Sequence, residues 1–300
     1  MSLKGKHFLT ISDFSTEDLQ AILHTAKELK AAQRTRKEHR RLEGRCLAMI
    51  FEKPSNRTRV SFEVGMYQLG GMALNVRPGE IDMGQREPIP DVSRVMARYV
   101  DLVMMRVMRH IDIEEYARYS SVPVINGLSD RFHPCQAISD IMTIEEQFGR
   151  LKGLTMCYVG DGNNVCASLI EVCKRFEIKM VVSCPKGFDP ELSQEEWGYS
   201  IVRDPFKAVA GADVVYTDVW TSMGQEEQTA RREKSFRGYA VTSEMMSLAA
   251  PKAIFMHCLP AHRGHEVTAE VVESNQSVVF EQAENRLHAQ KGIMVELLRE

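Results

Sequence analysis

Short apolar segments alternate with helix-like segments along most of this chain, and no other feature constrains its fold as strongly. The segments 46–51, 102–106 and 122–126 are short and apolar, as buried strands are. The stretches between them place apolar residues at helical spacing. Because strands that alternate with helices form a parallel sheet with helices on its faces, the pattern predicts an α/β fold.

A second series of the same kind follows in the other half of the chain. It predicts strands at 155–159, 179–183, 214–217 and 253–256. The chain has 300 residues, more than the roughly 100 to 200 that one domain usually contains. We therefore expect two domains, each with a central, mainly parallel sheet flanked by helices, and a linking helix near 136–149.

Charge and cysteine content exclude several classes of protein. Lys and Arg number 38 against 41 Asp and Glu, a net charge of −3, which argues against a polybasic nucleic-acid-binding protein. No uncharged apolar run approaches the roughly 18 residues that span a bilayer, and residues 1–8 lack the apolar stretch of a signal peptide. Seven cysteines without regular spacing are typical of reduced thiols, so we expect a cytoplasmic protein.

Polar residues beyond the carboxyl ends of strands are candidates for function, because open α/β sheets bind ligands there. After strand 46–51, Ser55 is placed to cap a helix. The free N–H groups of a helix start, the hydroxyls of Ser55 and Thr58, and a guanidinium would form an anion site suited to phosphate. Arg57 and Arg59 lie about 200° apart on a helix, so both cannot face one anion, and we favour Arg57. The alternative is an ordinary helix cap with surface arginines.

Two further strand ends carry a cation and an imidazole. Arg106 ends the strand 102–106, where it is either a second ligand for the same anion or a surface arginine. Pro134 suits the first turn of a helix, which puts His133 at the helix start and Gln136 one turn further on. Because a helix N-terminus disfavours imidazolium, we expect a neutral His133 ring that donates one hydrogen bond to a carbonyl group.

The second series offers a carboxylate and a thiol at strand ends. Asp218 follows the strand 214–217 and could hold an amine. Cys258 follows the strand 253–256 and could form part of a pocket wall. Asn164 lies in a turn after the strand 155–159, where we expect it at the rim of a pocket.

Two cofactor classes receive little support from the residues. The turn 159–165 resembles a dinucleotide-binding turn, but Val165 stands in place of the third glycine, which weakens an NAD-dependent dehydrogenase. The pairs His133/Cys135 and His257/Cys258 lack the usual spacing of zinc ligands. We therefore expect no metal site.

Taken together, the motifs resemble the transcarbamylase family in order and in spacing. They are Ser55-Asn56-Arg57-Thr58-Arg59, His133-Pro134-Cys135-Gln136, Asp218 to Gly224, and His257-Cys258-Leu259-Pro260. Within that family, Gly160 to Asn164, the Ser222-Met223-Gly224 loop and His257 to Pro260 resemble ornithine rather than aspartate carbamoyltransferases. The similarity covers residues 6–298.

The resemblance implies one domain for each substrate. Residues 1–135 would bind carbamoyl phosphate, and residues 136–284, including the linking helix 136–149, would bind L-ornithine. A C-terminal helix at 285–300 would return to the first domain. The residues implied for carbamoyl phosphate are Ser55, Asn56, Arg57, Thr58, Arg106, His133, Gln136, Cys258, Leu259 and Arg286. Those implied for ornithine are Asn164, Asp218, Ser222 and Met223, and the implied catalytic residues are Arg106, His133, Cys258 and Asp218.

The implied reaction is attack of the neutral δ-amine of ornithine on the carbamoyl carbon. It gives L-citrulline and phosphate, in arginine biosynthesis or, in reverse, in arginine breakdown. Donors from Arg106, His133 and Thr58 would stabilise the charge that grows on the carbonyl oxygen. No metal or organic cofactor is expected, because the leaving group is already activated. The resemblance also implies a homotrimer or a multiple of trimers, with active sites at subunit junctions.

Two other functions remain open at this stage. One is a transcarbamylase for another amine, such as putrescine or N-acetylornithine. The other is a non-catalytic binding protein on the same fold, although packing alone has no use for Arg57, Arg106, His133 and Asp218.

The loop 81–87 departs from the family pattern. Relatives commonly have Gln or His where this chain has Asp82, in a loop that reaches the phosphate of the neighbouring subunit. An extra anion there should repel phosphate, so either Gln85 or Arg86 makes the contact or the alignment shifts. We leave this loop out of the predicted site.

Overall fold

The chain divides into two compact units, and the polypeptide passes from one unit to the other twice. The structure is a computed structural model, and it describes residues 2–77, 79–221 and 229–299. Unit 1 consists of residues Met1–Met142 and Glu284–Glu300, and unit 2 consists of Thr143–Ala283. The two divisions fall within the helices α5 (Pro134–Phe148) and α12 (Val279–Leu298).

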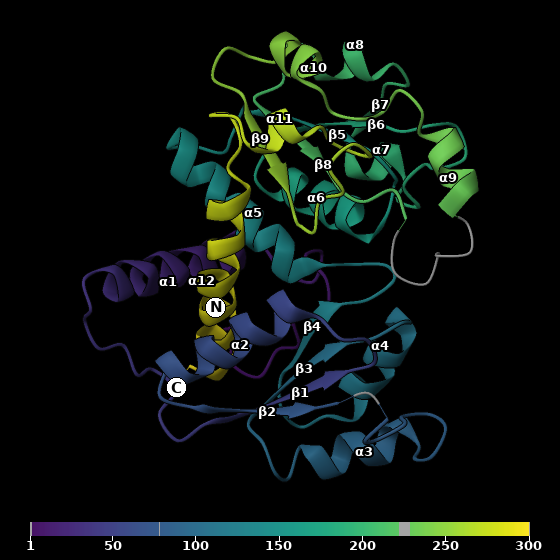
Figure 1. Cartoon of the computed structure of the whole chain (residues 1–300). Helices are drawn as coiled ribbons and strands as arrows, with labels where there is room; N and C mark the ends of the chain where they lie inside the picture. The colour runs from purple at the N-terminus through teal and green to yellow at the C-terminus, as the bar shows by residue number, and fades with distance from the viewer. Residues whose placement is uncertain (1, 78, 222–228, 300) are drawn as a thin grey trace. The chain divides into compact units, whose positions relative to one another are not determined.

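Unit 1 is built on a four-stranded sheet in which every neighbouring pair is parallel, in the order β2-β1-β3-β4 (Figure 1). Its elements are α1 (Thr16–Arg34), β1 (Cys46–Phe51), α2 (Asn56–Gln68), β2 (Met72–Val76), α3 (Ile89–Met96), β3 (Leu102–Arg106), α4 (His110–Tyr119), β4 (Val124–Leu128), and parts of α5 and α12. Helices α3 and α4 cover one face of this sheet, where residues such as Val92 and Ile113 pack against Ile50 and Val103.

Helices α1, α2 and α12 of unit 1 pack closely together. A Cβ added at Gly292 of α12 would lie 2.7 Å from the carbonyl oxygen of Ile22 in α1. A Cβ at Gly65 of α2 would lie 3.3 Å from the side chains of Lys291 and Met294. The glycine at 292 therefore allows the backbones of α12 and α1 to approach each other directly.

Unit 2 is built on a five-stranded parallel sheet in the order β7-β6-β5-β8-β9 (Figure 1). Its elements are the end of α5, β5 (Thr155–Val159), α6 (Asn164–Arg175), β6 (Lys179–Ser183), α7 (Gln194–Trp197), β7 (Ser200–Ile201), α8 (Pro205–Val209), β8 (Val214–Thr217), α9 (Thr229–Ser235), α10 (Ser243–Leu248), β9 (Ile254–His257), α11 (Ala269–Val272) and the start of α12. Its core joins β5, β8 and β9 to α8, α10 and α11 through buried residues such as Val159, Val215 and Met245.

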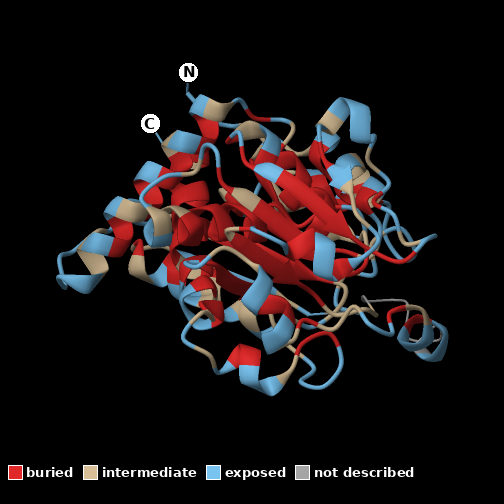
Figure 2. Ribbon diagram, turned by 90° about the horizontal axis from the view of Figure 1, so that it is seen from above, coloured by how far each residue is buried: buried red, intermediate tan, exposed pale blue. Residues whose placement is uncertain are grey.

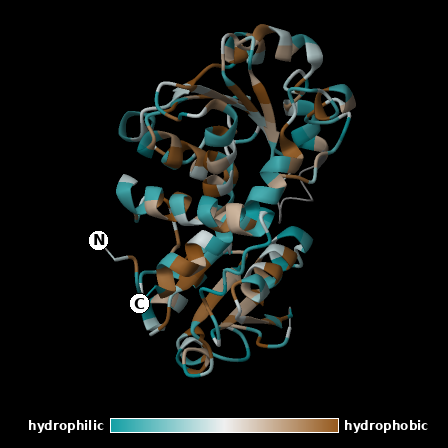
Figure 3. Cartoon of the chain, turned by 90° about the vertical axis from the view of Figure 1, so that its left-hand side faces the viewer, coloured by the Kyte–Doolittle hydropathy of each residue, from teal (hydrophilic) through white to brown (hydrophobic). Residues whose placement is uncertain are grey.

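Burial follows the hydrophobic pattern from which the fold was predicted. The central strands are buried and largely hydrophobic (Figures 2 and 3). The edge strand β2 differs, because most of its residues are partly or fully exposed. The predicted α/β class with two mainly parallel sheets is confirmed.

Each sheet reverses its strand order at one place. In unit 1, β2 lies on one side of β1, and β3 and β4 lie on the other. In unit 2, β6 and β7 lie on one side of β5, and β8 and β9 lie on the other. Helices following strands on the two sides diverge at such a point and leave a crevice at the carboxyl ends of the strands. The crevices are thus expected beyond Phe51 and Arg106 in unit 1, and beyond Val159 and Thr217 in unit 2.

No helix in the described part of the chain is long and apolar enough to cross a membrane.

Lys291 is a buried cation at the junction of α1, α2 and α12. Its ammonium group donates to the amide oxygens of Gln33 at 2.9 Å and Gln68 at 2.8 Å, and its Nζ lies 3.4 Å from the Nε2 of His39. These partners are polar but carry no formal negative charge. Burial therefore lowers the pKa of Lys291 to about 8.

This lowered pKa predicts that the free energy of unfolding rises with pH. Between about pH 8 and pH 10.5 the unfolded chain keeps the Lys291 proton and the folded chain releases it, which stabilises the folded state by at most about 3 kcal/mol. Lys291→Met should remove this increase, whereas replacement of the exposed Lys4 by Met should keep it. Calorimetric Tm values measured across this range test the prediction, and an equal pH slope in wild type and Lys291→Met would contradict it.

Candidate active site

The start of α2 lies directly after β1, at the predicted anion site. Ser55 is the N-cap residue, and its side chain accepts a hydrogen bond from the Thr58 N–H at 3.4 Å. The Ser55 hydroxyl also donates to the Thr58 hydroxyl at 3.1 Å. The predicted cap is confirmed, and it fixes two hydroxyls beside the free N–H groups of a helix start.

Arg57 and Arg59 differ in their partners, as their spacing on α2 suggested. The Arg59 guanidinium pairs with Glu63 on the exposed side of the helix at 2.6 Å. Arg57 instead lies close enough to His133 to influence the titration of its ring. The positive charge of Arg57 thus contributes to the electrostatic environment of His133.

His133 is buried, and three guanidinium groups are near enough to affect its pKa. Burial is the main reason why its pKa lies well below the usual range, and Arg286, Arg106 and Arg57 lower it further, in that order. This direction agrees with the neutral ring that we expect, but its causes, burial and neighbouring guanidinium groups, differ from the helix start that we proposed. Arg106 comes from β3 and Arg286 from α12, so residues far apart in the sequence produce this field.

A chain of hydrogen bonds connects α2, α5 and α12 in unit 1. Arg286 donates through Nη1 to the Gln136 Oε1 at 2.6 Å and through Nη2 to the Thr58 hydroxyl at 3.2 Å. The Gln136 amide nitrogen in turn donates to the Asp140 carboxylate at 2.8 Å. All four residues are buried. Asp140 fixes which end of the Gln136 amide faces Arg286, since a carboxylate can only accept.

In unit 2, Asp218 lies at the carboxyl end of β8 with both oxygens engaged. The Cys258 thiol donates to its Oδ1 at 3.0 Å, and the Asn163 amide donates to its Oδ2 at 2.9 Å. Asn163 is also the N-cap of α6, where its Oδ1 accepts from the N–H groups of Val165 and Cys166. The predicted carboxylate and thiol are therefore direct neighbours, and the helix cap orients the carboxylate.

The turn before α6 is closed by another segment of unit 2. A Cβ at Gly162 would lie 2.3 Å from the backbone nitrogen of Pro190, so this glycine allows two backbones to approach. The Asn164 side chain accepts from the Val165 N–H at 2.9 Å. These contacts give the turn a packing role in place of the dinucleotide contact that its glycines resembled.

One group of side chains in the described residues has the atom types that bind metals. It consists of Asp218, His257 and Cys258, whose ligating atoms lie within 4.8 Å of one another. The donor set does not fit a metal, because both His257 nitrogens are engaged. The ring accepts from the Leu259 N–H at 2.8 Å through Nδ1, so its proton is assigned to Nε2, which lies 3.1 Å from Glu266. Leu259 itself has φ of 59°, a conformation that a non-glycine residue adopts only when its surroundings hold it.

The remaining predicted residues are placed as follows. Asn56 begins α2 and is exposed. Ser222 and Met223 lie outside the described residues. Asp82, the residue that departs from the family pattern, has φ of 53° and lines a cavity of about 660 Å³ with Arg77 and Arg109 in unit 1.

Sequence reasoning missed the residues that orient the candidate groups. Asp140 lies one helical turn after Gln136, a spacing that places both on the same helix face and could have identified it. Asn163 precedes the helix that contains Asn164, so cap preference could have singled it out. Nothing in the local sequence connects Arg232 of α9 with Asp161, yet the two form a buried ion pair at 2.6 Å.

Comparison with known proteins assigns the family. Residues 6–146 match "Aspartate/ornithine carbamoyltransferase, carbamoyl-P binding domain", and residues 152–297 match "Aspartate/ornithine carbamoyltransferase, Asp/Orn binding domain". The chain belongs to the aspartate/ornithine carbamoyltransferase family. The resemblance inferred from the motifs is thereby confirmed.

Individual members of the family are similar over nearly their full length. The ornithine carbamoyltransferase of Thermococcus kodakarensis is 50% identical over an alignment that covers 98% of this chain and 96% of the relative. The solved ornithine carbamoyltransferase structure from Pyrococcus furiosus is similar with a TM-score of 0.96 and 48% identity, over 99% of this chain and 98% of that one. The ornithine carbamoyltransferase structure from Thermus thermophilus is similar with a TM-score of 0.90 and 42% identity, over 97% of this chain and 98% of that one.

The buried Asp161–Arg232 pair predicts that a single variant loses much more free energy of unfolding than the double variant. Both side chains are about 8% exposed, and Arg232 also donates to the Trp220 carbonyl. Arg232→Met would leave the Asp161 carboxylate buried without its partner and should lower the free energy of unfolding by about 3–5 kcal/mol. Adding Asp161→Asn removes the buried charge and should recover most of that loss.

Urea unfolding of the single and double variants measures this difference. The exposed pair Arg263–Glu273, with the same 2.6 Å separation, provides a matched control. Arg263→Met should cost less than about 1 kcal/mol. Equal losses in Arg232→Met and the double variant would refute the charge argument.

Proposed function

We propose that this chain transfers the carbamoyl group of carbamoyl phosphate to the δ-amine of L-ornithine, giving L-citrulline and phosphate. The observation that carries the proposal is that Arg57 and Arg106 follow the two strands at the switch point of the unit 1 sheet and, with Arg286, lower the pKa of the buried His133. Family membership and the ornithine carbamoyltransferase names of close relatives support the choice of substrates. We assign residues 1–135 and 285–300 to carbamoyl phosphate and residues 136–284 to ornithine.

The start of α2 suits the phosphate group. Helix N–H groups and the hydroxyls of Ser55 and Thr58 donate in fixed directions, and Arg57 adds a positive charge. Asn56 is the first residue of α2 and is assigned to the same phosphate by its place in the motif. A doubly charged leaving group also relieves the mutual repulsion of Arg57, Arg106 and Arg286.

The same field favours the transition state over the substrate. When the amine attacks, a nitrogen–carbon bond forms, negative charge grows on the carbonyl oxygen, and the bond to phosphate then breaks with its electron pair. The nitrogen loses one proton, which an oxygen of the departing phosphate can accept. Donors from Arg106 and His133 that are already in place stabilise the growing charge without reorganisation. Gln136, which Asp140 holds, is assigned to the carbamoyl group. Cys258 and Leu259 are assigned to it by their places in the family motifs.

In unit 2 we assign ornithine to the end of β8. Asp218 is the anionic group there, and its two contacts from Cys258 and Asn163 fix the carboxylate in one orientation. Such a fixed carboxylate can bind and orient an amine. Asn164, Ser222 and Met223 are assigned to ornithine by their places in the family motifs.

We also propose a homotrimer and a cytoplasmic location. Apolar side chains lie exposed on α2 and on the edge strand β2: Val60, Val64, Tyr67, Met72 and Leu74. An exposed apolar patch beside an unpaired sheet edge is typical of a subunit interface. The seven cysteines are free thiols, which supports a reducing compartment.

Release of phosphate from carbamoyl phosphate and formation of the carbamoylated amine, measured side by side with ornithine, putrescine and N-acetylornithine, test the proposed substrates. We expect product with ornithine alone. Faster turnover of putrescine or N-acetylornithine would identify a transcarbamylase of another specificity. Binding of carbamoyl phosphate without phosphate release from any amine would identify a binding protein.

Asp218→Asn tests the role of the carboxylate. The substitution keeps the shape and removes the charge, so kcat/KM for ornithine should fall on the order of 10²-fold while KM for carbamoyl phosphate stays the same. Glu191→Gln, at an exposed carboxylate of the same unit, is the control and should change neither value. Unchanged turnover and unchanged ornithine affinity in Asp218→Asn would rule out the proposed role.

A further inference from the structure

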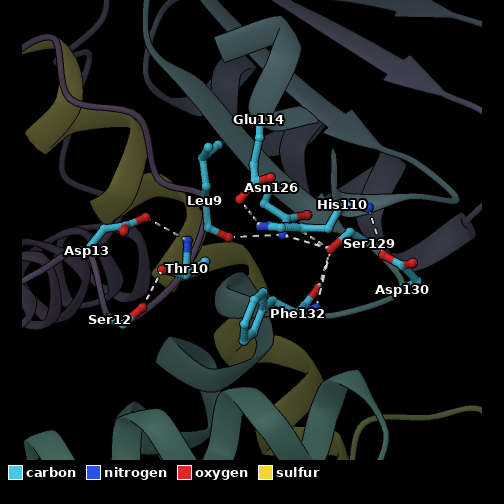
Figure 4. A network of polar contacts seen from close by, with 10 residues as sticks. All are labelled: Leu9, Thr10, Ser12, Asp13, His110, Glu114, Asn126, Ser129, Asp130 and Phe132. Carbon is cyan, nitrogen blue, oxygen red and sulfur yellow. Dashed lines mark hydrogen bonds and ion pairs between the residues drawn. The ribbon is translucent and has the colours of Figure 1, made fainter. Parts of the chain in front are cut away.

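A buried polar network in unit 1 surrounds the short turn that precedes His133 (Figure 4). The turn runs from Ser129 to Phe132 and is closed by the Ser129 N–H, which donates to the Phe132 carbonyl at 3.0 Å. The Phe132 N–H returns a hydrogen bond to the Ser129 hydroxyl at 3.3 Å. His133 is the next residue, so the conformation of this turn determines the position of the His133 backbone and thereby of its ring.

His110, the first residue of α4, contacts this turn in three ways. Its ring Nδ1 lies 2.9 Å from the Ser129 hydroxyl, its backbone N–H donates to the Asp130 carboxylate at 2.7 Å, and its ring packs edge-on against Phe132 at 5.1 Å (Figure 4). His110 and Ser129 are both buried. No step of the proposed reaction uses the His110 ring.

The pattern of donors indicates which way the bond between His110 and Ser129 runs. The N–H of Phe132 and the amide of Asn126 both donate to the Ser129 oxygen, each at 3.3 Å. The Ser129 hydroxyl has two candidate acceptors, the His110 Nδ1 at 2.9 Å and the Phe132 carbonyl at 3.4 Å, and the shorter distance assigns its proton to Nδ1. The ring therefore acts as an acceptor at Nδ1 and carries its proton on Nε2.

We propose that His110 is a positioning residue for His133: its ring Nδ1 holds the Ser129 hydroxyl, and through the turn of residues 129–132 it fixes the imidazole that serves the carbamoyl group. The expected effect on turnover rests on the function proposed above, whereas the effect on the position of His133 does not. Displacement of a reacting group by about 1 Å can cost on the order of 10²-fold in rate, so a contact outside the substrate pocket can control turnover.

The arrangement also predicts how pH acts on the turn. Burial lowers the pKa of His110, which keeps Nδ1 free to accept near neutral pH. Glu114 on α4, Asp130 in the turn and Asp13 in the N-terminal segment oppose this shift, and Arg131 adds to it. As pH falls through the pKa of His110, Nδ1 gains a proton and can no longer accept from Ser129, so the turn loosens.

Three variants separate positioning from general stability. His110→Leu removes the acceptor, and His110→Asn restores a polar group at the place of Nδ1 without a group that titrates. His24→Leu is the control, because His24 belongs to the same unit and its side chain is 75% exposed. Ser129→Ala breaks the same link from the other side and keeps the test open if His110→Leu does not fold.

Two measurements decide the outcome. NMR of histidine labelled with carbon-13 at Cε1 follows the His133 signal, and steady-state kinetics follow kcat and both KM values. We expect His110→Leu and Ser129→Ala to shift the His133 signal and to lower kcat/KM for carbamoyl phosphate about 10- to 100-fold, with KM for ornithine unchanged. His110→Asn should restore the His133 signal and kcat/KM for carbamoyl phosphate. Because Asn does not titrate, kcat/KM of this variant should fall less at acidic pH than that of the wild type.

Other results would overturn the inference. A wild-type His133 signal and wild-type kinetics in His110→Leu would show that the ring does not position His133. An equal loss for both substrates, accompanied by a lower Tm and not rescued by His110→Asn, would assign His110 a structural role only. If the wild-type chain makes no citrulline, the proposed function fails, and the His133 signal in the variants still decides the positioning role.

Discussion

Positive charge gathered around a buried, neutral imidazole is the constraint on which unit 1 depends. Arg57, Arg106 and Arg286 repel one another, and each also disfavours a proton on His133. Such a group is maintained because separate elements hold each member: α2, the end of β3 and α12. The hydrogen bonds from Arg286 to Thr58 and Gln136 orient one guanidinium of the three.

In unit 2 the candidate substrate ligand is a buried carboxylate. Asp218 is buried at the end of β8, and a carboxylate there is tolerable because a thiol and an amide donate to it. Asn163 serves two purposes at once, since it caps α6 and orients Asp218. A helix cap, an ordinary structural device, thereby fixes the geometry of a candidate substrate ligand.

Local sequence patterns predicted particular elements well where one interaction dominates. The cap at Ser55 and the first turn at Pro134 are confirmed, because cap and proline preferences depend on a few neighbouring backbone atoms. The strand predicted at 122–126 is observed at Val124–Leu128. It therefore starts two residues later than predicted and extends through Gly127 and Leu128. The polar Asn126 is tolerated inside the strand because its amide donates to the Leu9 carbonyl from a distant segment.

The sequence alone determined the class of fold and the family and indicated the candidate residues at strand ends, because these follow from hydrophobic period and from motifs of adjacent residues. The tertiary structure decided which groups orient the motifs. Asp140 behind Gln136, Asn163 behind Asp218, and His110 behind the turn before His133 all act through hydrogen bonds. Two of these three bonds join residues that lie on different elements. Their partners are chosen by packing, and packing depends on contacts between residues far apart in the chain, which no local pattern encodes.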